Sequence, residues 1–190
     1  MQKMKLLGAA TKKYTGLAIK TIRIQDLNTI KDVVSDASLN VKILHLVRDP
    51  RGVINSRRKM HEGNTDLARR KGRGADEILD LCEHYDRNLK TGSIAGWLHG
   101  RYKLVRYEDV AENPLPITAE IYKFIGMDVP ASVNKWLYNN TRFSKGGSFS
   151  VTRNSKQTAA AWETELDRHI VREIQQKCAD SMAKLGYKPV

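Results

Sequence analysis

The sequence predicts an α/β fold, in which a mostly parallel sheet is flanked by helices. Three segments near residues 17–24, 41–47 and 101–107 have the composition and apolar patterns of strands. The connections between them have helical apolar spacing or are long enough to cross over to a parallel neighbour. The chain of 190 residues, 41% hydrophobic and 28% charged, is long enough for one core, so we expect a single domain over residues 1–190.

The first predicted strand, 17–24, alternates apolar with polar residues and is rich in β-branched types. Lys20 lies on its polar face and is either a surface lysine near the strand end or a functional group; the residue pattern leaves both open. Residues 26–38 then form a helix-like connection to the second strand.

The second predicted strand, 41–47, is a nearly continuous apolar run interrupted by one histidine, which is typical of a strand buried on both faces of a parallel sheet. It ends at Arg48. Asp49 can cap a following helix, and Pro50 fits the first helical position because its missing N–H costs nothing there.

This arrangement predicts an anion site. Arg48 would lie beside a helix N-terminus, which carries partial positive charge, and Ser56 follows about two turns further along the same helix. A phosphate could then be bound by the guanidinium fork and the hydroxyl, with Arg51, Arg57 and Arg58 adding a positive field. The alternative is a capped helix whose surface arginines pair with Asp49.

The rest of the chain predicts further helices, one strand and one loop. Residues 75–91 form an amphipathic helix, for whose carboxylates and His84 we expect no metal role. The third strand, 101–107, precedes a helix from about Pro114 to Gly126, and a short helix surrounds residues 133–137. Residues 144–155 form a Gly/Ser-rich basic loop, and an apolar stripe from about Thr164 predicts one long helix that ends at Gly186.

Two cysteines, Cys82 and Cys178, fall on the apolar sides of two predicted helices. They have no CxxC spacing, which argues against a zinc site or a dithiol redox motif. Two buried free thiols are the default expectation. A disulfide between distant helices is the alternative if the chain is luminal.

The formal charge of +12 implies an acidic partner, which could be nucleic acid, an anionic membrane, a polyanionic glycan or a nucleotide. The chain has few aromatic residues for stacking on single-stranded nucleic acid and no recognised nucleic-acid motif, so we expect no nucleic-acid partner. No apolar run is long enough to span a bilayer, and the first residues make a poor signal peptide. Membrane attachment would therefore need an anchor that this chain lacks.

The segment Leu-Val-Arg-Asp-Pro-Arg-Gly-Val-Ile-Asn-Ser-Arg, residues 46–57, resembles the 3′-phosphate-binding motif of sulfotransferases that use 3′-phosphoadenosine 5′-phosphosulfate (PAPS). It is most similar to the Golgi carbohydrate 6-O-sulfotransferases that act on N-acetylglucosamine, galactose and N-acetylgalactosamine. The resemblance implies that Arg48 and Ser56 bind the 3′-phosphate of the nucleotide.

Further segments support the resemblance and imply further site residues. Val-Arg-Tyr-Glu-Asp, residues 105–109, resembles the family's Tyr-Glu-Asp segment, which implies that Tyr107 contacts the adenine, while Glu108 and Asp109 orient arginines. The Arg-Asn-Ser…Trp segment resembles the loop that closes over the nucleotide, which implies phosphate contacts from Arg153 and Ser155. Trp162 would anchor that loop.

The first strand is similar to the Lys-Thr-containing strand of the family, in which a lysine lies near the sulfonate. Lys20-Thr21 matches, and Lys20 is therefore the candidate catalytic residue. The related cytosolic sulfotransferases place their catalytic histidine next, and Ile22 stands at that position here, so no catalytic base is implied.

The resemblance implies a P-loop-NTPase-like parallel sheet that lacks the first βα unit, because residues 8–16 have neither the spacing nor the preceding strand of a 5′-phosphosulfate loop. We therefore expect an N-terminally incomplete sulfotransferase domain. Its intact form would transfer a sulfonate from PAPS to the 6-hydroxyl of a glycan sugar in the Golgi, without a metal. The alternative is a non-catalytic, truncated relative that binds a nucleotide or a glycan.

Overall fold

Two parallel strands form the centre of the computed structural model, which describes residues 16–22, 24–62, 74–142 and 154–190. Strand β1 (Ile43–Val47) pairs with β2 (Tyr102–Arg106), with Ile43 opposite Tyr102 and Val47 opposite Arg106. These two strands confirm the predicted strands 41–47 and 101–107, and with the surrounding helices they confirm the α/β class. The expected burial of 41–47 on both faces is wrong, because Leu44 and Leu46 are 42% and 61% exposed. Both strands point the same way, so the residues that follow them, Arg48 and Tyr107, lie at the same edge of the sheet.

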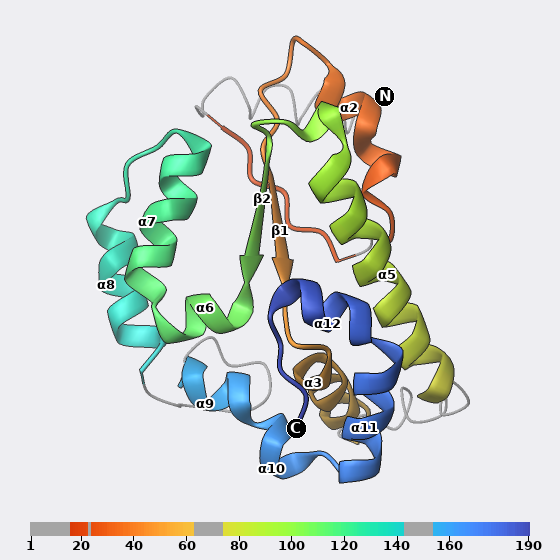
Figure 1. The fold of residues 1–190 in the computed structure, drawn as a ribbon. Coiled ribbons are helices and arrows are strands. Elements are labelled where there is room, and N and C mark those ends of the chain that lie inside the picture. The colour runs from red at the N-terminus through yellow and green to blue at the C-terminus, as the bar shows by residue number, and fades with distance from the viewer. Residues whose placement is uncertain (1–15, 23, 63–73, 143–153) are drawn as a thin grey trace.

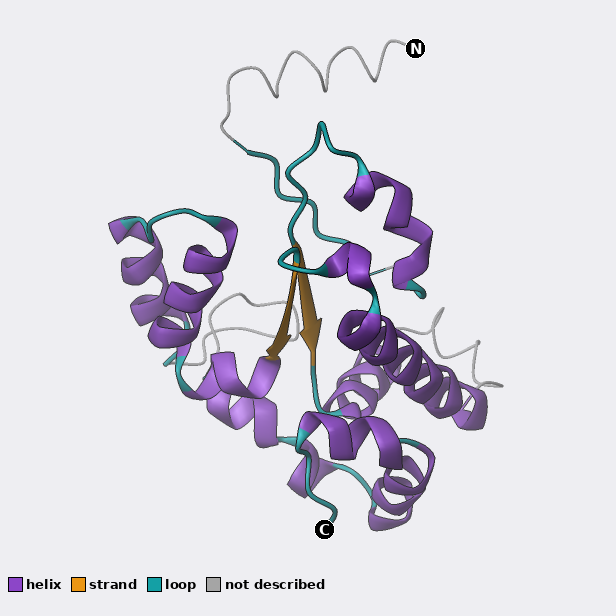
Figure 2. Ribbon diagram, turned by 45° about the horizontal axis from the view of Figure 1, so that its top comes forward, coloured by secondary structure: helices purple, strands orange, loops and turns teal. Residues whose placement is uncertain are grey.

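Helices surround the pair on both sides and at its carboxyl end (Figures 1 and 2). Helices α7 and α8 lie on one side of the strands and α5 on the other, while α3, α11 and α12 gather beyond Val47. The helical elements are η1 (Leu27–Ile30), α2 (Lys31–Ser35), α3 (Pro50–Glu62), α5 (Gly74–Ile94), η2 (Gly96–Leu98), α6 (Tyr107–Glu112), α7 (Pro114–Ile125), α8 (Ala131–Asn140), α9 (Ser155–Ala160), α10 (Trp162–Glu165), α11 (Arg168–Lys177) and α12 (Ala179–Leu185). Within the described ranges, none of these helices is long and apolar enough to cross a membrane.

The predicted strand at 17–24 is wrong. Residues 16–22 have no regular secondary structure, and Ile19 and Ile22 are 77% and 81% exposed. Alternation of apolar and polar residues stabilises a strand only when a neighbouring strand pairs with it and one face is covered. Residues 16–22 have neither support. The helical connection predicted after this strand is present as η1 and α2.

The C-terminal apolar stripe is also divided differently from the prediction of one long helix. Helix α11 ends at Lys177, and α12 begins at Ala179, with Cys178 between them at φ −100° and ψ 18°. The stripe itself is buried as expected: Ile174, Cys178 and Met182 are at most 3% exposed. The apolar period therefore identified the buried residues but did not reveal the break.

Cys82 and Cys178 form a disulfide that joins α5 to the junction of α11 and α12. The default expectation of two free thiols is wrong, and the alternative is correct. Both cysteines lie in the main core, whose other members come from β1, α3, α5 and the C-terminal helices. The bond thus fixes the helices that pack beyond the carboxyl end of β1.

One face of the strand pair holds a histidine–tyrosine contact. Nδ1 of His45 lies 2.7 Å from the Tyr102 hydroxyl, and the Tyr102 ring packs so closely on Gly92 of α5 that an added Cβ there would lie 2.4 Å from its Cζ.

Replacing Gly92 by alanine should therefore destabilise the fold by about 1–3 kcal/mol, because overpacking outweighs the gain of about 1 kcal/mol in helix propensity. Urea unfolding measures the difference. Gly96→Ala, whose Cβ would meet no atom within 4 Å, should cost less, and an equal loss in both variants would contradict the steric explanation.

The same contact predicts a pH dependence of stability. Burial lowers the pKa of His45. Below about pH 6.5 the unfolded chain therefore binds a proton that the folded chain binds only at lower pH, so the free energy of unfolding should fall as the pH drops, by up to about 1.4 kcal/mol per pH unit. Urea unfolding between about pH 7.5 and pH 5.5 should show a steeper fall for the wild type than for His45→Gln. Parallel curves for the two proteins would contradict this assignment.

Candidate functional site

The turn between β1 and α3 is fixed by side chains that lie far away in the sequence. The Tyr85 hydroxyl accepts a hydrogen bond from the Arg48 N–H at 3.2 Å and donates one to the Arg48 carbonyl at 2.8 Å. Asp49 Oδ1 accepts the Arg51 N–H at 2.8 Å, which is the N-cap interaction predicted for it. The turn therefore places Arg48 at the N-terminal end of α3, where partial positive charge favours an anion.

The Arg48 side chain lies against the first turn of α3. An added Cβ at Gly52 would lie 2.9 Å from Arg48 Nε, so only glycine accommodates this approach without a shift. The guanidinium stacks on Tyr107, with Cζ 4.7 Å from the ring centroid, and Nη2 donates to the Thr158 carbonyl of α9 at 2.8 Å. Arg48 Nε is buried and has no hydrogen-bond acceptor among the described residues.

Ser56 lies on the same face of α3 as Gly52, because the two residues are four apart, and it is half-buried. The structure therefore brings Arg48 and Tyr107 into contact and places Ser56 one helical turn beyond the guanidinium. All three were singled out from the sequence. Their roles in binding stay predictions.

The other predicted site residues are placed as follows. Ser155 begins α9 and its N–H donates to the Thr141 carbonyl at 3.0 Å, so it lies on the helix that contacts Arg48. Arg153 lies outside the described residues. Lys20 is exposed in the segment 16–22, and none of the described contacts of Arg48 or Tyr107 involves it.

Arg51 belongs to the scaffold rather than to the positive field predicted for it. It is 3% exposed and forms a bidentate ion pair with Asp49, with Nη2 2.6 Å from Oδ2. Its Nη1 donates to Gln175 and to the Lys188 carbonyl, and its guanidinium lies 3.9 Å from the ring centroid of Trp162. Arg51 thus joins the turn to the C-terminal segment. The alternative of an arginine paired with Asp49 is correct here, but the pair is buried.

Glu108 also supports the turn. Its Oε1 accepts the Asp49 N–H at 2.9 Å, and its Oε2 accepts the Tyr187 hydroxyl at 2.6 Å. Asp109 lies 3.7 Å from Arg106, whose guanidinium stacks on Tyr187. Burial is the main cause that raises the pKa values of Tyr85 and Tyr187, that of Tyr85 to about 12, so both hydroxyls remain protonated at neutral pH.

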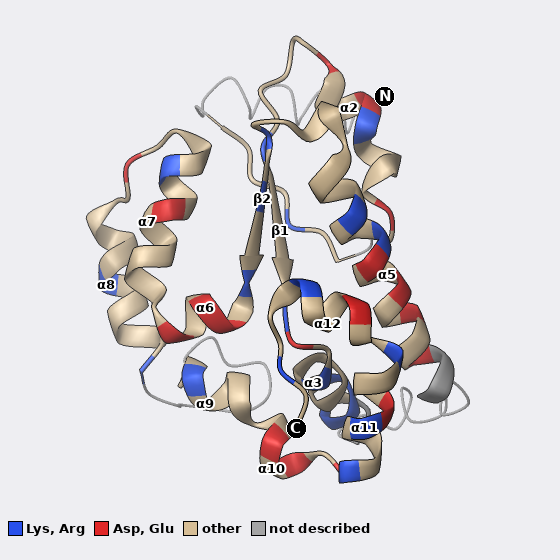
Figure 3. Cartoon of the chain, in the orientation of Figure 1, with Lys and Arg blue, Asp and Glu red and all other residues tan. Residues whose placement is uncertain are grey.

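Charge is divided around this end of the sheet (Figure 3). Basic residues lie on α3 and α9, and acidic residues lie in the first turn of α6 and on α10. Several of these groups pair directly, as in Lys156–Glu112 and Lys59–Glu165. Among the described residues, no group of three His, Cys, Asp or Glu side chains could hold a metal ion.

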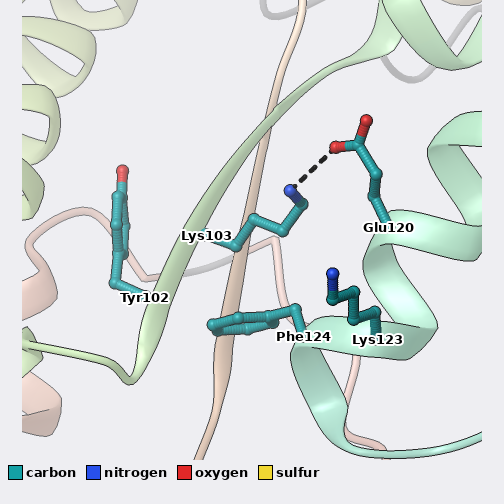
Figure 4. A pocket seen from close by; sticks show the side chains of 5 residues that line it. All are labelled: Tyr102, Lys103, Glu120, Lys123 and Phe124. Atoms are coloured by element: carbon teal, nitrogen blue, oxygen red, sulfur yellow. Dashed lines mark hydrogen bonds and ion pairs between the residues drawn. The ribbon is translucent and has the colours of Figure 1, made fainter.

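A pocket of about 490 Å³ lies elsewhere, between the start of β2 and α7 (Figure 4). It is lined by Tyr102, Lys103, Glu120, Lys123 and Phe124, and Lys103 pairs with Glu120 across it at 3.0 Å. Because Tyr102 and Lys103 begin β2, whereas Tyr107 follows its end, this pocket is not formed by the residues around Arg48.

Sequence reasoning missed Tyr85 and Tyr187. Tyr85 lies within the amphipathic helix predicted over residues 75–91, and no local signal indicates that its hydroxyl would reach a residue 37 positions away. Tyr187 reaches Glu108 across 79 positions. The available sequence signal is a tyrosine at an otherwise apolar, buried position, because a buried tyrosine hydroxyl usually requires a hydrogen-bond partner.

A family model described as the sulfotransferase domain matches residues 19–186. The chain therefore belongs to the sulfotransferase family. Within that family its relatives are carbohydrate sulfotransferases, as the sequence resemblance predicted. Carbohydrate sulfotransferase 1 of Mus musculus is 37% identical over 195 residues, which cover 96% of this chain and 47% of the relative. Carbohydrate sulfotransferase 6 of Homo sapiens is 30% identical over 209 residues, which cover 100% and 52%.

Among solved structures, a sulfotransferase domain from the curacin biosynthetic pathway matches with a TM-score of 0.64 and 18% sequence identity, covering 98% of this chain and 68% of that chain. This likeness supports the sulfotransferase fold. The chain spans about half the length of the curated relatives it matches.

Proposed function

We propose that the protein, in its complete form, transfers a sulfonate group from PAPS to the 6-hydroxyl of a sugar in a glycan. Membership of the sulfotransferase family supports the transfer of a sulfonate, and the carbohydrate sulfotransferase relatives support a sugar acceptor. We propose the 6-hydroxyl and a keratan-type, chondroitin-type or N-acetylglucosamine acceptor because residues 46–57 resemble the motif of the carbohydrate 6-O-sulfotransferases.

The observation that carries this proposal is the arrangement of Arg48. Its guanidinium stacks on Tyr107 and follows the first turn of α3 towards Ser56, and its Nε lacks an acceptor among the described residues. A phosphate monoester would supply that acceptor, and Ser56 would add a hydroxyl donor. We assign Arg48 and Ser56 to the 3′-phosphate, Tyr107 to the adenine, and Arg153 and Ser155 to a segment that closes over the nucleotide.

The reaction itself is an in-line displacement at sulfur. The sugar 6-oxygen forms a bond to sulfur and releases its proton to solvent, while the bond from sulfur to the bridging oxygen breaks and adenosine 3′,5′-bisphosphate leaves with that bonding electron pair. A cation near the bridging oxygen stabilises the charge that develops there, and Lys20 is our candidate for this role. No step in this scheme uses a metal.

We also propose that the reaction takes place in the Golgi lumen. The Cys82–Cys178 disulfide supports an oxidising compartment, because intracellular reducing systems keep most cytosolic thiols reduced. A glycan acceptor is consistent with the net charge of +12, since many glycans are polyanionic.

Transfer of a labelled sulfonate from PAPS to a set of sugar acceptors tests the proposal. The protein should be expressed from its full gene, with the described chain alone as a comparison. We expect the label to appear in a glycan fraction, and we expect a 6-O-specific sulfatase to remove it. Absence of transfer to any sugar would overturn the enzyme assignment.

A non-catalytic nucleotide-binding protein is the second candidate. It is favoured by the Arg48 guanidinium, which stacks on Tyr107 and whose buried Nε has no acceptor among the described residues, at the position assigned to the 3′-phosphate. Retention on immobilised adenosine 3′,5′-bisphosphate together with no sulfonate transfer by the full protein would identify this function. A protein that is neither retained nor active would contradict both candidates.

A further inference from the structure

The peptide groups of Arg48 lie just beyond the last residue of β1 and are held by one hydroxyl. Tyr85 accepts from the Arg48 N–H and donates to the Arg48 carbonyl, so it uses both its donor and one acceptor position on the same residue. Such a double contact fixes the direction in which the Arg48 side chain leaves the turn. Tyr85 belongs to α5, whereas the described contacts of the guanidinium itself are with Thr158 and Tyr107.

The N–H of Asp49 belongs to the same peptide group as the Arg48 carbonyl, and it is held on the opposite side of that peptide by a second side chain. Glu108 accepts the Asp49 N–H with one carboxylate oxygen and the Tyr187 hydroxyl with the other. Tyr187 is 7% exposed, and its ring is covered by the Arg106 guanidinium at 4.5 Å. Tyr187 therefore fixes the carboxylate that fixes Asp49, and Glu108 lies next to Tyr107, on which Arg48 stacks.

The two tyrosines belong to elements that the disulfide joins. Cys82 precedes Tyr85 by one turn of α5, and Cys178 joins α11 to α12, after which Gly186 in the left-handed conformation turns the chain into Tyr187. The Arg48 turn is thus supported from both segments that the Cys82–Cys178 bond joins. Tyr85 contacts it directly, and Tyr187 supports it through Glu108.

We propose that Tyr85, Glu108 and Tyr187 are positioning residues that aim the Arg48 guanidinium at a phosphate monoester, and that the Cys82–Cys178 disulfide holds their two supports together. The identity of the ligand, a nucleotide 3′-phosphate, rests on the proposed function. The positioning itself rests only on the contacts described here.

Single hydroxyl deletions test the proposal in the full chain. Tyr85→Phe and Tyr187→Phe keep the rings and remove one hydroxyl each, and Tyr102→Phe is the matched control, because it removes the hydroxyl that contacts His45 near the start of β2. We expect each of the first two variants to bind adenosine 3′,5′-bisphosphate about five- to tenfold more weakly by calorimetry, the loss expected for one hydrogen bond. Tyr102→Phe should bind like the wild type even if its melting temperature falls as far.

Amide hydrogen exchange gives a second readout that requires no nucleotide. The N–H groups of Arg48 and Asp49 should exchange faster in Tyr85→Phe and Tyr187→Phe, respectively, than in the wild type, and should be unchanged in Tyr102→Phe. A wild type that does not bind the nucleotide would refute the proposed ligand, while the exchange rates would still decide the positioning. The inference would be overturned if the Arg48 and Asp49 amides exchanged as slowly in Tyr85→Phe and Tyr187→Phe as they do in Tyr102→Phe. It would also be overturned if the loss of affinity in all three variants merely followed the loss of melting temperature.

Discussion

Replacing Arg48 by alanine should weaken the binding of adenosine 3′,5′-bisphosphate by about 100-fold. Hydrogen bonds between charged groups contribute roughly 1.5–3 kcal/mol each, and a bidentate guanidinium–phosphate contact therefore accounts for about two decades of affinity. The fold should lose much less, because Arg48 is only half-buried and makes one described side-chain hydrogen bond, to the Thr158 carbonyl. Calorimetric titration of the folded variant measures the loss.

Two further substitutions show whether geometry or charge is responsible. Arg48→Lys keeps the charge but loses the planar fork, so it should fall between wild type and Arg48→Ala. Arg57→Ala removes a charge from the same helix, where Arg57 pairs with Glu77 at a partly exposed position, and should change the affinity by no more than about threefold. If Arg57→Ala and Arg48→Ala weaken binding equally, a diffuse positive field rather than a phosphate clamp binds the nucleotide.

The fold was predictable where local pattern and packing agree. The apolar run before Arg48 and the Asp-Pro pair after it specify a strand and a capped helix within a dozen residues, and both are present in β1 and α3. Residues 17–24 have an equally clear local pattern, yet residues 16–22 form no strand, and neither of the described strands pairs with them. Strand formation depends on pairing with a neighbouring strand, and the alternation of apolar and polar residues does not indicate whether such a strand is present.

The candidate site was predictable in its ligand-facing residues but not in its supports. Arg48 and Tyr107 follow two parallel strands, so their meeting at one sheet edge follows from the topology, and the structure brings them into contact. Arg51 lies two positions from Asp49, and the sequence predicted that it would add positive charge at the phosphate site. It is buried instead, and its burial depends on Trp162, Gln175 and Lys188. Those residues lie more than a hundred positions away, and no spacing within the motif indicates that they come together there.

The second large effect concerns the Cys82–Cys178 bond, whose loss should lower the free energy of unfolding by about 2–5 kcal/mol. The bond joins residues 96 positions apart, and a loop of this length removes much conformational freedom from the unfolded chain. Both sulfurs are buried in the core, so Cys82→Ala/Cys178→Ala loses packing as well as the cross-link. Urea unfolding of the double variant, and of the wild type with and without a reductant, measures the effect.

Reduction should also make the transition steeper, because the reduced chain exposes more surface when it unfolds, and the denaturant dependence of the free energy increases with that surface. Reduced wild type should therefore show a lower urea midpoint together with a larger slope.

An unchanged midpoint after complete reduction, verified by mass after alkylation, would show that the core alone holds α5 against α11 and α12. The tyrosine contacts to the Arg48 turn would then survive without the bond, and nucleotide affinity should be the same in both redox states. If instead the midpoint and the nucleotide affinity fall together, and affinity is lost at temperatures where the reduced chain is still folded, the disulfide supports the Arg48 turn as well as the core.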